Sequence, residues 1–407
     1  MQKKYALSTV QSITLVTLCL LVGGFLLAFP QQSLQAALIG LDTWLKNVFP
    51  ALLPFFITSE MMIALGLVDF FAVLLRPVMK PLFRCSGKSS FIWAMSITSG
   101  YPVGAKLTAS FLEKGDITVH EAQRIMAFCS TSGPLFMLGA VGVGMLNSSA
   151  AGKVIAASHY IASIIVGLLF RFYIPSGRIK SQKTDNPPTF KEALSAMLAA
   201  RKKDSRTLGE MLGDAVRNSM NTLLYIGGFI ILFSVIINIL LKINLINAIS
   251  QILMPFILPL GIRPQLLPGL IGGIFEMTAG CKLISQTIAP LPQKIILSAF
   301  VISWSGFSIH CQVMGFLSRH GLSLSLYMKA KLLHGILAST LAWGIMKIFP
   351  NPELDAFYPF APQPNMSFSG QLQSAWQWVL YCILSLTLTA LVSLITRHLN
   401  PSRHSRQ

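Results

Sequence analysis

An apolar segment of this chain is interrupted near its centre by the stretch Ser99-Gly100-Tyr101-Pro102-Val103-Gly104-Ala105-Lys106-Leu107. Proline removes a backbone donor and glycine permits unusual backbone angles, so an unbroken helix cannot pass through this stretch. Inside a membrane, such backbone is stable only where protein buries it or where it lines a cavity. We therefore expect residues 89–111 to enter the membrane and return on the same side, as a re-entrant hairpin.

A second copy of this pattern lies far away along the chain. The copies run over residues 69–136 and 247–309, and the second contains the interruption Glu276-Met277-Thr278-Ala279-Gly280-Cys281-Lys282-Leu283. We expect residues 264–289 to form the second re-entrant hairpin. Each copy ends in another broken apolar segment, at residues 127–133 and 299–306. Paired interrupted segments at corresponding places in two halves point to a transporter's binding site.

The composition indicates a polytopic membrane protein whose main partner is the lipid bilayer. The 407 residues are 53% hydrophobic and 11% charged, against about 25% charged residues in a typical soluble domain. The net charge of +18 comes from basic residues in short loops, as expected for cytoplasmic loops, and no motif supports nucleic-acid binding. The six cysteines show no metal-ligand spacing, so we expect no metal site and no cofactor.

Apolar runs long enough to cross the bilayer, about 20 residues each, recur along the chain. The expected spans are 9–29, 37–65, 123–147, 152–174, 216–242, 293–317, 325–349 and 375–396, and the segments 67–84 and 245–261 read as flat or proline-interrupted helices. The predicted organisation is a first transmembrane helix in 1–36, repeat 1 in 37–174, a cytoplasmic linker in 175–215, repeat 2 in 216–350, an external loop in 351–374 and a last transmembrane helix with a basic tail in 375–407. Within the linker, Phe190–Ala200 is a candidate amphipathic helix.

Loop charges orient these segments. If both hairpins return to the side they entered from, the basic loop 171–217 lies inside and the loop 351–374, which has no Lys or Arg, lies outside. This agrees with the positive-inside rule and puts both termini in the cytoplasm. The two copies then have opposite orientations. The predicted fold class is an all-α polytopic membrane protein with an inverted-topology repeat and two re-entrant hairpins.

The four breaks supply the candidate substrate-binding residues, because half-helix ends there leave backbone groups unpaired. The candidates are Ser99, Gly100, Tyr101, Gly104, Lys106, Thr131, Ser132, Gly133, Glu276, Thr278, Gly280, Lys282, Ser303, Ser305 and Gly306. For each hydroxyl, capping of the local backbone is the alternative to contact with a ligand. No set of nucleophile, base and orienting group is present, so we expect no enzyme activity.

Three ionisable residues at the breaks indicate the charge of the substrate. Lys106 and Lys282 occupy equivalent places, and if both point inward the site is cationic and prefers a small anionic molecule. The alternative is that each reaches the membrane interface at the end of a hairpin. Glu276 has no acidic counterpart in the first copy. It could bind a coupling ion, H⁺ or Na⁺, or pair with Lys282.

Several of these motifs resemble a known family. The stretch 99–106, the stretch Thr131-Ser132-Gly133-Pro134-Leu135-Phe136 and the glycines at 139, 142 and 144 are similar to the YlbJ-type sporulation integral membrane proteins of endospore-forming bacteria. The two copies also resemble the nucleoside-recognition (Gate) domain shared with concentrative nucleoside transporters, which implies a fold like theirs.

The resemblance implies a role in sporulation. The implied activity is transport of dipicolinate, a small aromatic dianion, from the mother cell toward the forespore, and the implied location is the mother-cell or outer forespore membrane. Two other readings stay open: a nucleoside-type carrier, and a non-transporting scaffold needed for spore maturation (cortex). The partners would then be further copies of the chain or other sporulation membrane proteins.

Overall fold

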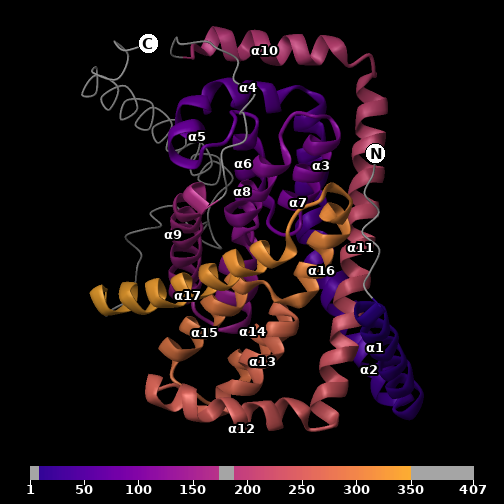
Figure 1. Cartoon of the computed structure of the whole chain (residues 1–407), viewed down its shortest axis with the longest axis vertical. Helices are drawn as coiled ribbons and strands as arrows, with labels where there is room; N and C mark the ends of the chain where they lie inside the picture. The colour runs from indigo at the N-terminus through magenta and orange to yellow at the C-terminus, as the bar shows by residue number, and fades with distance from the viewer. Residues whose placement is uncertain (1–8, 174–187, 350–407) are drawn as a thin grey trace, which may run out of the picture.

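The computed structural model describes residues 9–173 and 188–349, and every regular element in these ranges is a helix (Figure 1). The all-helical prediction is confirmed for this part of the chain. The external loop predicted at 351–374, the last predicted span and the basic tail lie outside the described residues, as do residues 1–8 and 174–187 of the chain.

The first half contains eleven helical elements within the described range. They are α1 (Thr9–Ala28), α2 (Pro30–Thr43), η1 (Trp44–Val48), α3 (Phe49–Ala64), α4 (Leu67–Leu74), α5 (Arg76–Phe83), α6 (Ser89–Ser99), α7 (Val103–Glu113), α8 (Val119–Cys129), η2 (Leu135–Met145) and α9 (Ser149–Tyr173). The span predicted at 37–65 instead begins at Pro30, and the chain bends by 106° between α1 and α2. Pro30 has no backbone donor for α1 but suits the first position of a new helix.

The second half begins with a helix in the linker and ends with a long one. Its elements are α10 (Phe190–Lys203), α11 (Leu208–Lys242), α12 (Leu245–Ile257), η3 (Leu258–Leu260), η4 (Pro264–Leu266), α13 (Leu267–Phe275), α14 (Met277–Gln286), α15 (Leu291–Trp304), α16 (Gly306–Leu317), η5 (Ser318–His320) and α17 (Leu324–Ile348). The helix predicted within the linker is present as α10. It packs on α4, where the rings of Phe70 and Phe190 meet edge to face at 5.6 Å.

Both predicted hairpins are present as antiparallel helix pairs. In the first, Phe91 of α6 stacks on Phe111 of α7 with ring centroids 6.5 Å apart, and Gly104 packs against Ser96. In the second, α13 and α14 lie backbone to backbone. Gly269 faces Ile284 there, and Gly273 faces Gly280. In each hairpin the facing residue numbers rise on one helix and fall on the other, as an antiparallel pair requires.

The chain turns at the first hairpin tip through a conformation that requires glycine. Gly100 has φ 79° and ψ −164°, a region that L-residues with a side chain essentially avoid. A Cβ atom there would also collide with the backbone nitrogen of Gly133. Gly100 therefore brings the hairpin tip against the break between α8 and η2. The sequence predicts a break at this place, and the structure confirms it.

The other predicted broken span is also confirmed. The helix α15 ends at Trp304 and α16 begins at Gly306, with Ser305 between them at φ 73°. Both broken spans thus place two short helix ends in the interior. Side chains hold some of the backbone groups at these breaks, as His159 does for the backbone nitrogen of Ser132.

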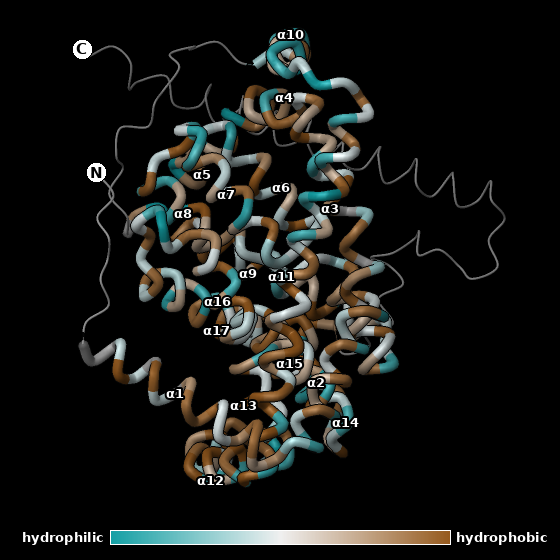
Figure 2. Tube along the Cα trace, turned by 90° about the vertical axis from the view of Figure 1, so that its right-hand side faces the viewer, coloured by the Kyte–Doolittle hydropathy of each residue, from teal (hydrophilic) through white to brown (hydrophobic). Residues whose placement is uncertain are grey.

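The two halves approach the interior from opposite ends of the molecule. Figure 1 shows α4, α5 and α10 at one end and α12 at the other, with α11 running along the side between them. The hairpin α6–α7 extends inward from the first end, and the hairpin α13–α14 extends inward from the second. Hydrophobic residues dominate α12 and α13, whereas α10 is more hydrophilic (Figure 2).

Three helical stretches of the described chain are long and apolar enough to cross a membrane: Ser149–Phe172, Leu208–Lys242 and Leu291–His320. Two bent pairs bring this to as many as five, if each pair is one span. The helix predicted at 325–349 forms as α17 but is not among them, and it carries Lys329, Lys331 and Lys347. The helices are thus consistent with a multi-pass membrane protein.

Candidate functional site

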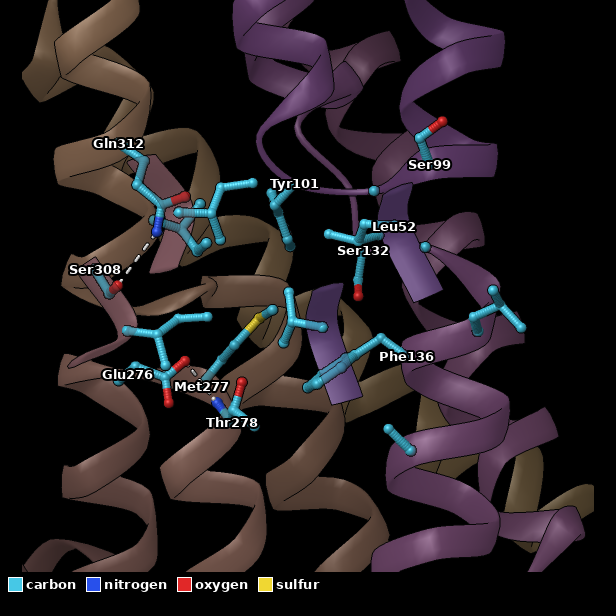
Figure 3. Close-up of a pocket in the computed structure, with 18 of the residues that line it drawn as sticks. Leu52, Ser99, Tyr101, Ser132, Phe136, Glu276, Met277, Thr278, Ser308 and Gln312 are labelled. Atoms are coloured by element: carbon cyan, nitrogen blue, oxygen red, sulfur yellow. Dashed lines mark hydrogen bonds between the residues drawn. The ribbon is translucent and has the colours of Figure 1, made fainter. Parts of the chain in front are cut away.

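A cavity of about 120 Å³ lies where the two hairpin tips face each other (Figure 3). The first hairpin contributes residues 98–101 and the second contributes 276–278. The broken spans complete the wall, with residues between 132 and 136 on one side and Ser308, Ile309 and Gln312 on the other. Four interruptions that are distant in sequence therefore surround a single space.

The wall of this cavity is mainly apolar, with polar groups concentrated at the breaks. Its apolar lining comes from Leu52, Leu135, Phe136, Met145, Ile226, Ile230, Met277 and Ile309, among others. Within the described part of the chain, none of the lining residues is a lysine, an arginine or a histidine. Such a wall suits a small organic molecule with an apolar body and a few polar groups.

Glu276 brings the one carboxylate into the lining. It precedes α14 in an extended conformation, and its side chain caps that helix. One carboxylate oxygen accepts a hydrogen bond from the backbone nitrogen of Thr278 at 3.0 Å, and the other accepts one from Ala279 at 2.7 Å. The carboxylate satisfies two donors that the start of a helix leaves unpaired, and its charge suits the positive end of the helix dipole.

Two buried polar atoms of the lining residues have no hydrogen-bond partner in the described part of the chain and lie just beneath the cavity surface. Ser132 Oγ and Gln312 Oε1 make no hydrogen bond within the described residues, although both side chains are almost fully buried. Figure 3 shows Ser132 and Gln312 on opposite sides of the cavity. Buried polar groups are nearly always paired in proteins, so these atoms are candidates for contacts with a bound molecule.

The two equivalent lysines do not meet in this cavity. Lys106 Nζ lies 2.5 Å from a carboxylate oxygen of Glu60, and the pair lines a separate polar hollow of about 240 Å³ that Arg206 and Asp214 also line. Lys282 is exposed and does not pair with Glu276. The cationic cavity expected from two inward-pointing lysines is therefore not formed.

Comparison with known proteins gives the family. The nucleoside-recognition (Gate) model matches residues 45–149 and 223–347. The chain is also 37% identical over 395 residues, 96% of both chains, to the sporulation integral membrane protein YlbJ of Bacillus subtilis strain 168. This chain belongs to the YlbJ family. A weaker match, 27% over 169 residues, is to an uncharacterised protein of Alkalihalophilus pseudofirmus and covers 40% of this chain and 35% of that one.

Membership of the YlbJ family, together with the apolar helices, makes this chain a multi-pass integral membrane protein. The two stretches that match the Gate model contain one hairpin and one broken span each. The Gate model thus matches each of the two stretches whose hairpins and broken spans surround the cavity.

In this YlbJ-family chain the candidate residues fall into two groups. Those that line the cavity are Ser99, Gly100, Tyr101, Ser132, Gly133, Glu276 and Thr278. The others lie outside the lining: Gly104, Lys106, Thr131, Gly280, Lys282, Ser303, Ser305 and Gly306. Several of this second group have structural contacts, because Gly104 and Gly280 allow close helix packing and Thr131 Oγ1 donates to the carbonyl oxygen of Ser96 at 3.0 Å.

A buried polar network behind Tyr101 is absent from the candidates. It includes His159 of α9 and both Lys331 and His334 of α17, all with 0% of their surface exposed. Each lies within a continuous helix, away from the interruptions that supplied the candidates. A signal was nevertheless present, because an ionisable residue within a transmembrane segment is a functional candidate by default.

Proposed function

We propose that this YlbJ-family protein is a membrane carrier that moves a small organic solute through the central cavity by alternating access. The observation that carries the proposal is the cavity itself, which both hairpin tips and both broken spans line. Discontinuous helices that meet in the interior are the usual construction of a transporter's binding site.

An inverted-topology repeat of the concentrative-nucleoside-transporter kind is part of this proposal. Each half has a flat helical segment, then a hairpin, then a broken helix, and then a long helix. The two hairpins enter the molecule from opposite ends (Figure 1), which supports two copies of opposite orientation. In the corresponding topology both chain termini are cytoplasmic, and rocking of one half against the other would expose the cavity to each side in turn.

The cavity favours a ring-shaped solute that carries little or no negative charge. Phe136 and Met277 offer apolar surface, whereas Ser132 and Gln312 offer hydrogen bonds. Glu276 would repel an anion, and no basic side chain lines the wall within the described residues. A neutral heterocyclic solute such as a nucleoside therefore fits the electrostatics better than a dianion does.

Dipicolinate is the second candidate, and the helix ends favour it. The first residues of η2 and α16, Leu135 and Ser308 among them, lie in the cavity wall. The starts of helices carry partial positive charge and free donors that suit carboxylates. For this solute, the direction we propose is from the mother cell toward the forespore, across the membrane that lies between them.

Uptake by proteoliposomes that contain the purified full chain tests the proposal. Radiolabelled uridine and dipicolinate are offered separately, and protein-free liposomes give the background. We expect uptake of at least one of the two to rise above that background. Background uptake of both solutes, by protein that is folded and inserted, would contradict a carrier for these solute classes and favour the scaffold.

The charge of the solute is tested by Glu276→Gln, with Glu60→Gln as the matched control outside the cavity. Loss of the repelling charge should raise dipicolinate uptake several-fold, whereas uptake of a neutral solute should fall because the cap of α14 weakens. Glu60→Gln should leave both unchanged. An equal effect of the two substitutions would show that the cavity carboxylate has no special influence on the solute.

A further inference from the structure

The side chain of Lys331 is fully buried behind the first hairpin tip. Its Nζ donates hydrogen bonds to Tyr101 Oη at 2.7 Å and to the carbonyl oxygen of Ser130 at 2.8 Å, and it lies 3.1 Å from His334 Nδ1. Within residues 9–173 and 188–349, it forms no ion pair with a carboxylate. A buried lysine without a counter-ion is unusual, so its partners need an explanation.

The groups around Lys331 Nζ are mostly hydrogen-bond acceptors. The oxygens of Ser130 and His159 are carbonyls and can only accept, and His334 Nε2 lies 2.9 Å from the latter. His334 Nε2 therefore carries a proton. Tyr101 donates its own proton to the carbonyl oxygen of Ile302 at 3.2 Å, so its oxygen accepts from Lys331.

These contacts suit an ammonium group at Lys331. An ammonium has three donors for the three acceptors, which are Tyr101 Oη, the carbonyl oxygen of Ser130 and His334 Nδ1. A positive charge at Lys331 therefore satisfies every hydrogen bond of this pocket.

The position of this cation is that of an ion site in a discontinuous helix. The helix α8 ends at Cys129, and the carbonyl of Ser130 follows at its C-terminal end. Such helix ends carry partial negative charge, and in transporters they coordinate the coupling Na⁺ or H⁺. Here the Ser130 carbonyl already accepts a hydrogen bond from Lys331.

The cation is linked to the solute cavity and to both broken spans. Tyr101 lines the cavity and contacts Lys331 directly. His159 then connects the two breaks: its Nε2 accepts a hydrogen bond from the backbone nitrogen of Ser132 at 3.0 Å, and its Nδ1 donates one to Ser303 Oγ at 2.7 Å. A charge at Lys331 therefore holds in place the elements that alternating access would move.

We propose that Lys331 is a tethered cation that occupies the site a coupling metal ion would otherwise take. The consequence rests on the carrier function proposed above: solute movement does not require Na⁺ or another metal cation. The site itself does not depend on that function, because it is defined by the contacts of Lys331 alone. Removal of the tethered cation should create a site that accepts a free one.

The thermal unfolding midpoint of the purified full chain tests the site without any transport measurement. Wild type and Lys331→Ala are heated in detergent with choline chloride, NaCl or propylammonium chloride at equal ionic strength. We expect Lys331→Ala to unfold at a lower temperature in choline, and propylammonium or Na⁺ to raise its midpoint by about 2 °C or more by binding the folded state. The wild-type midpoint should be the same in all three salts.

Two matched variants separate the charge from the packing. Lys331→Met keeps the length of the side chain and fills the space, so cations should not raise its midpoint. Lys329→Ala removes an exposed lysine of the same helix and should behave as wild type. Stabilisation of wild type by Na⁺ over choline, or no response of Lys331→Ala to either cation, would overturn the proposal.

Proteoliposome uptake then tests the consequence. Wild-type uptake of the transported solute, uridine or dipicolinate, should be equal within about twofold in Na⁺ and in choline media. The uptake rate of Lys331→Ala should be at least tenfold lower in choline, and Na⁺ or propylammonium should restore part of that rate. A strict Na⁺ requirement of the wild type would overturn the proposal even if Lys331→Ala did not fold. If no solute is transported by any variant, the carrier function fails and the thermal measurement still decides the cation site.

Discussion

The two hairpin tips interrupt their helices by different chemical means. At the first tip the backbone makes the break, because Gly100 adopts φ 79° beside Gly133. At the second tip a side chain makes it, because the Glu276 carboxylate caps α14. The same architecture therefore has two unlike tips: a carboxylate lies in the cavity wall at the second, whereas Tyr101 of the first contacts Lys331 of α17.

The largest effect is expected where backbone conformation alone makes the turn. Gly100→Ala places a side chain in a strained conformation and against the backbone of Gly133. We expect it to lower the free energy of unfolding by about 3 kcal/mol and to reduce the yield of folded protein. The measurement is the thermal unfolding midpoint of the purified chain in detergent.

Gly115→Ala is the matched control for the first tip. Gly115 also has a positive φ, 68°, but a Cβ atom there would meet nothing within 4 Å. Its substitution should lower the free energy of unfolding by about 1–2 kcal/mol, from the backbone conformation alone. If both variants lose the same stability, contact between the tip and Gly133 contributes nothing.

An intermediate effect is expected at the second tip, where the cap can be removed without strain. Glu276→Ala leaves the backbone nitrogens of Thr278 and Ala279 without their acceptor. The free energy of unfolding should fall by about 2 kcal/mol, and solute uptake should change as well. Chemical or thermal unfolding gives the first quantity, and proteoliposome uptake gives the second.

Thr118→Ala is the matched control, because it removes a helix cap that lies outside the cavity. Thr118 caps α8 by accepting a hydrogen bond from the backbone nitrogen of Glu121 at 3.2 Å. Its loss should lower stability by about 1 kcal/mol with no change in the half-saturating solute concentration. A comparable change in that concentration for both cap variants would mean that Glu276 acts through helix stability only.

The smallest effects are expected at the two lysines that match in sequence. Lys106→Met breaks the partly exposed pair with Glu60 and should lower the free energy of unfolding by about 0.5 kcal/mol. Lys282→Met, at an exposed position, should change stability by less than that. A tenfold loss of uptake in both variants would contradict the finding that neither lysine lines the cavity.

The interruptions could be predicted from sequence because they depend on local chemistry. Gly100 and Pro102 together disfavour a continuous helix through this stretch, and the structure has both hairpins and both broken spans at the predicted places. The gathering of Ser99, Ser132 and Thr278 around a single cavity followed from the pairing of the two copies. Their role in binding stays a prediction.

The orientation of the lysines could not be read from the alignment of the two copies. Lys106 is the fourth residue of α7, whereas Lys282 is the sixth residue of α14. Each lysine nevertheless follows by two residues a glycine that packs on the partner helix of its hairpin, Gly104 or Gly280, so the two positions correspond. Their surroundings differ, because Lys106 meets Glu60 of α3 whereas Lys282 is exposed. The partners of Lys331 were equally beyond the sequence, because Tyr101 lies 230 positions away and only the folded chain brings them together.

The length of the uncharged part of α11 indicates how deep the cavity lies in the bilayer. After Arg217 the helix continues for 25 residues to Lys242 without a charged side chain until its last position, which corresponds to about 37 Å. Ile226 and Ile230, which line the cavity, lie about 12 and 18 Å along that stretch. For a hydrocarbon layer about 30 Å thick centred on that stretch, Ile230 lies near the middle and Ile226 nearer the Arg217 side, so a solute in the cavity would be deep within the bilayer.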